Sequence, residues 1–168
     1  MRPCTPFLST RVMTMGTLGI STNTRLLGLA IIYRDNLIDY KIHLHKSPWS
    51  PSKAYKIITS LEPCVRRYSI RNVILSIPYE HHTTKESKYL ISVIKKYFEE
   101  KNIPFKTAQP ETLFSLYPEG QKKTKKALMK SLTEKFPELR YCYNKELRNK
   151  KRYYIKLFEA VAVASLKE

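Results

Sequence analysis

The chain has 168 residues, 42% of them hydrophobic, so it is long enough and apolar enough to form one domain with a core of its own. Its 31 Lys and Arg residues stand against 14 Asp and Glu and give a formal net charge of +17. This excess favours a polyanionic partner, most often nucleic acid, over an anionic membrane surface, because no basic amphipathic segment carries an exposed aromatic anchor. The longest apolar runs, 26–32 and 160–164, are too short to cross a bilayer.

Residues 1–14 lack the apolar centre of a signal peptide. We expect them to be a flexible arm in front of a single domain at 15–168, or to precede the true translation start, which is open among Met1, Met13 and Met15. The three cysteines lie far apart without a C-x-x-C pair, which predicts reduced thiols in a cytoplasmic protein.

The first third of the chain predicts three strands. Residues 16–21 and 26–34 are rich in β-forming side chains, and 37–45 alternates between apolar and polar residues. That alternation places four side chains on one face: Ile38, Tyr40, Ile42 and Leu44. Asp35-Asn36 is favourable turn sequence, so the second and third strands are expected to pair as an antiparallel hairpin.

Helices and strands then alternate. Ser50 is a predicted N-cap followed by Pro51 at the first helical position, and Pro63 is expected to end or bend that helix. Its predicted apolar stripe consists of Tyr55, Ile58 and Leu61. The other predicted elements are a buried strand at 72–77, a helix from Thr83 or Thr84, a strand at 105–108, and helices at 110–117, 122–136 and 145–166. This order predicts an α/β fold with a mixed five-stranded sheet, an antiparallel hairpin plus parallel strands, flanked by helices.

Four segments in this order resemble the ribonuclease H-like superfamily, nearest to RuvC-type Holliday-junction resolvases and the YqgF-type pre-16S ribosomal RNA nucleases. They are GISTNTRLLGLAII at 19–32, VILSIPYEHHTTKESKYLISVIKKYFEEKNIPF at 73–105, KKTKKALMKSL at 122–132 and FEAVAVASL at 158–166. The first segment keeps Gly19, Ile20 and Gly28 of the family pattern but has Ser21 where the family has aspartate.

The resemblance implies two-metal phosphodiester cleavage, in which a carboxylate bridges two divalent cations about 3.5–4 Å apart. It assigns the expected acids to Ser21, Ser76 and Glu159, so only one acid remains. A serine hydroxyl is uncharged and binds Mg²⁺ poorly. The resemblance therefore predicts a catalytically degenerate nuclease without a cofactor.

An active endonuclease on branched DNA or structured RNA is the alternative. Glu80 would act with Glu159, and His81 or His82 would complete a site for Mg²⁺ or Mn²⁺. The plainer interpretation makes the two histidines a solvated loop. For Glu159 the plainer interpretation is an ion pair with Lys156, three residues earlier on the same helix.

Basic residues near the C-terminus are the predicted nucleic-acid-binding group: Lys122, Lys123, Lys126, Lys130, Lys145, Arg148, Lys151, Arg152 and Tyr153. Lysines at 122, 126 and 130 are expected on one helix face, opposite an apolar stripe, and Tyr153 follows arginine as in sites that stack unpaired bases. A scaffold or ribosome-associated factor remains a third hypothesis. DNA and RNA are not distinguished, and a homodimer is an open expectation from the resolvase resemblance.

Overall fold

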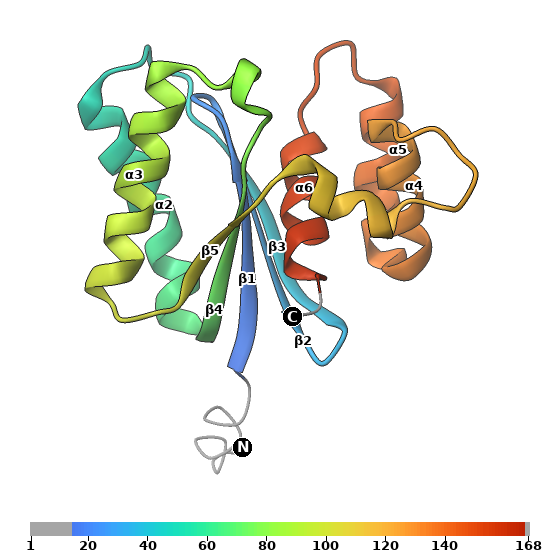
Figure 1. Ribbon diagram of the computed structural model, residues 1–168, viewed down its shortest axis with the longest axis horizontal. Helices are drawn as coiled ribbons and strands as arrows, with labels where there is room; N and C mark the ends of the chain where they lie inside the picture. Colours follow the sequence, from blue (N-terminus) through green and yellow to red (C-terminus); the bar gives the residue numbers. More distant parts are fainter. Residues whose placement is uncertain (1–14, 167–168) are drawn as a thin grey trace.

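The computed structural model describes residues 15–166, and these form one five-stranded sheet in the order β3-β2-β1-β4-β5 (Figure 1). The strands are β1 (Met15–Thr22), β2 (Leu26–Tyr33), β3 (Asn36–Leu44), β4 (Ser69–Ser76) and β5 (Phe105–Ala108). β1 and β2 are antiparallel, as are β2 and β3, whereas β4 runs parallel to β1 and to β5. The predicted mixed sheet is therefore confirmed.

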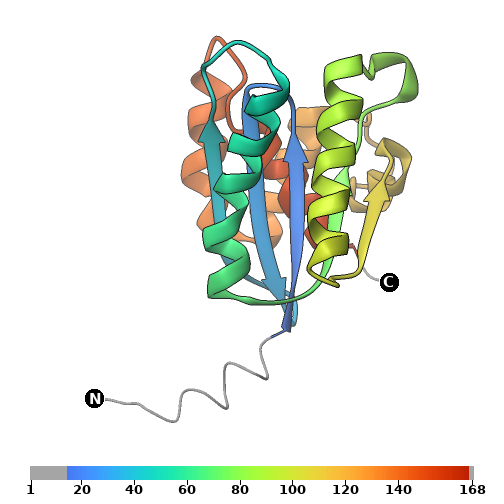
Figure 2. The ribbon, with the colours of Figure 1, turned by 90° about the vertical axis from the view of Figure 1, so that its left-hand side faces the viewer.

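Helices cover both faces of the sheet. They are α2 (Pro51–Arg67), α3 (Lys85–Glu100), α4 (Lys125–Lys135), α5 (Arg140–Arg148) and α6 (Ile155–Ala164), with three short 3₁₀ helices η1 (Glu80–His82), η2 (Pro110–Leu116) and η3 (Pro137–Leu139). Figure 2 shows α2 and α3 in front of the sheet, where they bury one half of the core. The other half lies between the sheet and α6, with α4 and α5 packed behind that helix.

Helix α6 lies directly on β1 and β2 because two glycines remove side chains from the contact. A Cβ at Gly19 would overlap the backbone carbonyl of Ala160, and a Cβ at Gly28 would overlap the backbone of Lys156. Nearly every residue of α6 is buried, so this short helix is a central part of the core. The glycines of the 19–32 segment therefore fix the position of the helix that carries Glu159.

The β2–β3 hairpin is present, but its turn lies one residue earlier than predicted. Arg34 and Asp35 form the turn, both with positive φ, and Asn36 already pairs with Tyr33. The register then shifts between Ile31 and Ile32, as in a β-bulge, which reverses the side-chain alternation of β3.

The predicted apolar face of β3 is therefore wrong at two of its four positions. Leu37 is buried, whereas Ile38 is 47% exposed and Leu44 is 36% exposed. Tyr40 and Ile42 do pack against the core as expected.

Helix α2 begins as predicted, since the Ser50 hydroxyl accepts a hydrogen bond from the Lys53 backbone N–H at 3.3 Å. It does not end at Pro63, however, but continues to Arg67. Burial of Leu61 and Cys64 on both sides of the proline holds the helix on the sheet. Its buried stripe excludes Tyr55, which is 58% exposed, and uses Ala54 and Ile57 instead.

The predicted helix at 145–166 is wrong: it is two helices, α5 and α6, separated by residues 149–154. The carboxylate of Glu146 accepts hydrogen bonds from the backbone N–H groups of Tyr153 and Tyr154, at 3.1 and 2.9 Å, and so closes the loop. The basic residues 150–152 stay exposed in this loop, where their charges remain hydrated.

Among the described residues no helix is both long and apolar enough to cross a membrane. Cys64 and Cys142 are buried free thiols, as expected for reduced cysteines. The predicted arm at 1–14, with the choice of start residue, lies outside the described residues.

Candidate functional site

The candidate site lies where β1 and β4 end, at the edge of the sheet where α6 begins. Ser21 and Ser76 are register partners on these two parallel strands, so their positions are neighbours. Glu159 faces them from the second turn of α6. The structure thus brings together the three positions to which the family resemblance assigns the catalytic acids.

Both carboxylate oxygens of Glu159 are already bound within the chain. The Ser21 hydroxyl donates to Oε1 at 2.8 Å, and the Lys156 ammonium donates to the same oxygen at 2.9 Å. The Lys125 ammonium, from the first turn of α4, donates to Oε2. The carboxylate is therefore held by two cations and one hydroxyl. The expected ion pair with Lys156 is one part of this larger arrangement.

The charge of Glu159 is stabilised although the residue is only 7% exposed. Burial raises the pKa of this carboxyl, but the nearby ammonium groups of Lys156 and Lys125 more than offset that effect and lower its pKa from 4.5 to about 2. Glu159 is thus ionised at neutral pH. Its charge is matched by lysines of the same chain.

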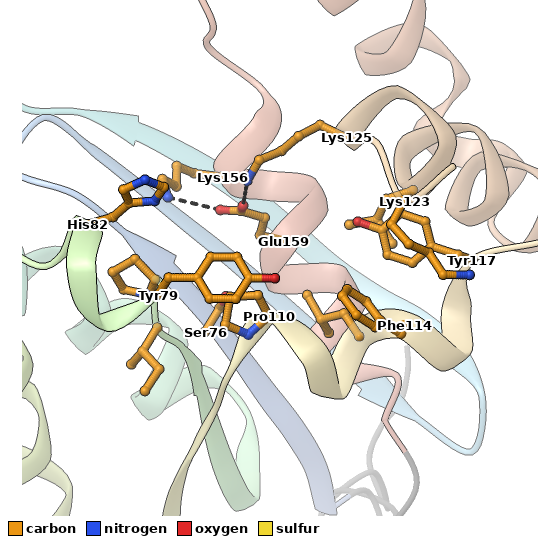
Figure 3. A pocket seen from close by; sticks show the side chains of 14 residues that line it. Ser76, Tyr79, His82, Pro110, Phe114, Tyr117, Lys123, Lys125, Lys156 and Glu159 are labelled. Atoms are coloured by element: carbon orange, nitrogen blue, oxygen red, sulfur yellow. Dashed lines mark hydrogen bonds and ion pairs between the residues drawn. The ribbon is translucent and has the colours of Figure 1, made fainter. Parts of the chain in front are cut away.

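A pocket of about 380 Å³ opens beside Glu159 (Figure 3). Lys125 and Lys156 line it where they bind the Glu159 carboxylate, and Lys123 lines it where it lies over the Tyr117 ring. The remaining lining residues come from the end of β4, from η1 and from η2: Ser76, Ile77, Pro78, Tyr79, His82, Pro110, Leu113, Phe114, Tyr117 and Leu128. With three lysines against one carboxylate, the ionised groups of this lining carry a net charge of +2.

Glu80 does not join Glu159. Its side chain is 87% exposed and pairs with Lys88 at 3.5 Å. His81 stacks on the Tyr79 ring, with ring centroids 5.6 Å apart, whereas His82 does line the pocket. Of the alternative set, only His82 and Glu159 thus border the same cavity.

These donors do not fit a two-metal centre. Across residues 15–166, no group of three or more His, Cys, Asp or Glu residues is placed to hold a metal ion. Both oxygens of Glu159 are bound to ammonium or hydroxyl groups, and the net positive lining opposes a divalent cation. The same field attracts phosphate.

The residues of the predicted nucleic-acid-binding group do not all lie at one place: one lines the pocket beside Glu159, four line a second hollow, and four line neither cavity. Lys123 lines the pocket described above, but α4 begins only at Lys125, so Lys122 precedes the helix and shares no helical face with Lys126 and Lys130. The last two are exposed on α4, and Arg148 is exposed at the end of α5.

A second basic hollow, of about 400 Å³, lies on the β2–β3 side of the start of α6. Its charged and aromatic lining consists of Arg25, Lys145, Lys150, Lys151, Arg152, Tyr153 and Tyr154. Tyr154 belongs to this hollow and Lys156 to the first pocket, so the two cavities flank the first turn of α6. Together they form a basic edge.

Sequence reasoning missed Lys125 as a partner of Glu159, and it also missed the aromatic lining of the pocket. Lys125 is one of several lysines in a run and lies 34 residues from its partner Glu159. The available signal was Thr124, a good N-cap residue, whose hydroxyl accepts from the Ala127 backbone N–H at 3.1 Å. That cap starts α4 at Lys125 and directs this side chain to the sheet edge.

No protein-family model and no curated protein matches the sequence. Solved structures do match the fold. Thermus thermophilus RuvC in complex with a Holliday junction substrate has a TM-score of 0.67 and 13% identity, with 89% of this chain and 90% of that chain covered. The Fowlpox virus resolvase in complex with Holliday junction DNA has a TM-score of 0.57 and 18% identity, with 89% and 94% covered. The chain therefore shares the RuvC-like ribonuclease H fold of these resolvases.

Proposed function

We propose that this chain is a nucleic-acid-binding domain that uses the RuvC-like fold without two-metal nuclease chemistry. The observation that carries the proposal is the state of Glu159, whose two oxygens bind Lys125, Lys156 and Ser21. Two-metal cleavage needs a carboxylate free to bridge two divalent cations. Here the chain's own ammonium groups occupy the carboxylate.

The basic edge supports nucleic acid as the partner. Its two hollows carry ammonium and guanidinium groups on both sides of the start of α6, and the whole chain carries +17. Such a field releases counterions from phosphate and makes binding strongly salt-dependent. Two structures with the same fold contain Holliday junction DNA, which makes a branched duplex the first substrate to test.

Three further arginines form a basic group at another place on the molecule. Arg66 and Arg67 end α2 and Arg71 is in the first half of β4, at the opposite end of the sheet. Arg66 also pairs with Glu62 at 3.3 Å. The proposed interface therefore excludes this group and is confined to the edge around α6.

The experiment is a gel series with labelled four-way junction, duplex DNA and hairpin RNA, each in Mg²⁺, Mn²⁺ or EDTA. The proposal predicts shifted, intact substrate in every metal condition, with affinity falling steeply as salt rises. Metal-dependent cleavage that Glu159→Gln abolishes would instead establish the active endonuclease. Absence of any shift would reject nucleic acid as the partner.

A further inference from the structure

The pocket beside Glu159 has two chemically different walls. Lys125 and Lys156, which bind the Glu159 carboxylate, form the cationic wall (Figure 3). The aromatic wall consists of the rings of Tyr79, Phe114 and Tyr117. Lys123 lies beside Tyr117. A phosphate group can bind to ammonium and hydroxyl groups, but it offers no flat surface on which an aromatic ring can stack. The aromatic wall therefore favours a ligand that carries a flat ring beside its phosphate.

The aromatic rings are open to solvent at the pocket. Tyr79 is 37% exposed and Phe114 is 39% exposed, although burial of such large rings would stabilise the fold. Phe114 meets Tyr117 edge to face with centroids 6.0 Å apart, and Tyr79 stacks on His81 at the pocket margin. Tyr79 directly precedes η1, Phe114 lies in η2 and Tyr117 follows η2, so these segments line the cavity with aromatic rings, the kind of side chain on which proteins stack bases.

The cationic wall retains capacity for an anion. Each ammonium has three N–H donors, and the Lys125 side chain is 49% exposed while it donates to Glu159. Lys123 lies over the Tyr117 ring, 5.4 Å from its centroid, and within the described residues it forms no ion pair with a carboxylate. This lysine therefore links the two walls.

We propose that this pocket takes one unpaired nucleotide of the bound nucleic acid, with its phosphate on the lysines and its base against the aromatic wall. The inference rests on the proposed function and names the ligand of that site. A cavity of about 380 Å³ lies in the size range of small-ligand sites and accommodates a single nucleotide unit rather than a duplex. Because a paired base must first leave its stack, an already unpaired nucleotide enters more readily. The pocket thus selects loops, bulges and branch points.

The test is fluorescence anisotropy in EDTA with a labelled DNA duplex, the same duplex carrying a three-thymidine bulge, and an RNA hairpin with a uridine loop. The key variant is Tyr79→Leu with Phe114→Leu, which removes two exposed rings and leaves the lysines in place. The matched control is Tyr55→Leu, since Tyr55 is equally aromatic, 58% exposed and on α2. Circular dichroism verifies that all variants remain folded.

The wild-type protein is expected to bind the bulged duplex about tenfold more tightly than the plain duplex, in line with the stacking of one base. The double variant should lose this preference and keep its affinity for the plain duplex, whereas the Tyr55 control should behave as wild type. The RNA arm shows whether the unpaired unit is accepted from RNA as well.

Three results would overturn the inference. The first is equal affinity for plain and bulged duplex, and the second is an unchanged preference in the double variant. The third is full displacement of the bulged DNA by free thymidine monophosphate at a concentration similar to that at which bulged DNA saturates the protein. The first two leave nucleic-acid binding in place, and the third assigns the pocket to a free nucleotide. Failure to bind any of the polymers would reject the proposed function itself.

Discussion

Replacement of Glu159 by glutamine should destabilise the fold by an amount that depends on pH. The folded-state pKa of this carboxyl is lowered from 4.5 to about 2, so its ionised form stabilises the native state at every pH above 4.5. At 1.36 kcal/mol per pKa unit, the shift corresponds to about 3 kcal/mol at neutral pH. For a domain of this size that is a decrease in Tm of roughly 6–12 °C.

The sign of the effect follows from the lowered pKa. As pH falls from 4.5 towards 2, Glu159 takes up a proton in the wild type and its advantage over glutamine declines, to about half at pH 3. Urea unfolding of both proteins between pH 7 and pH 2.5 measures this difference directly. Glu80→Gln is the control, because that side chain is 87% exposed, and its stability should match the wild type throughout. A Glu159→Gln difference that is small at pH 7 or constant with pH would refute the reasoning.

Three further predictions concern a close backbone approach, a loop contact and the second basic hollow. Gly28→Ala places a Cβ against the backbone of α6 and should lower the free energy of unfolding by about 1–3 kcal/mol, measured by urea denaturation; an unchanged midpoint would contradict the close approach. Glu146→Ala removes the acceptor of two backbone N–H groups and should cost about 1 kcal/mol, with faster amide exchange at residues 153–154 as the specific sign. Lys151→Ala with Arg152→Ala should reduce the salt slope of junction binding by about 2, whereas an unchanged slope would remove this hollow from the interface.

Much of the fold could be predicted from the sequence because its elements have strong local signals. The apolar runs that became β1, β2 and β4, the caps at Ser50 and Thr84, and the short strand 105–108 all follow from periodicity and capping chemistry. The sequence order of these elements was sufficient for the mixed sheet.

The errors occurred where tertiary contacts override local pattern. The break between α5 and α6 depends on Glu146 reaching the backbone of residues 153 and 154. The exposure of Ile38 depends on the register of the β2–β3 pair, in which Ile38 has no partner because Ile31 pairs with Asp39 and Ile32 with Leu37. Pro63 is tolerated because the surrounding helix is fixed by burial on the sheet. None of these contacts has a signature in the residues immediately around it.

For the site, the alignment of Ser21, Ser76 and Glu159 at one sheet edge was predictable from the family resemblance. The neutralisation of Glu159 was only half predictable. Lys156 is on the same helix, one turn away, whereas Lys125 reaches the carboxylate from a different helix. Which lysine of a lysine-rich run does so is decided by where α4 begins.

The most direct test of the central claim is Mn²⁺ binding measured by electron paramagnetic resonance, in which only the free hexaaqua ion gives the strong signal. With Glu159 held by Lys125 and Lys156, stoichiometric protein should leave the free Mn²⁺ signal unchanged. Loss of two equivalents of free Mn²⁺ per chain, restored by Glu159→Gln, would show that the carboxylate releases its lysines to bind metal. That result would contradict the account.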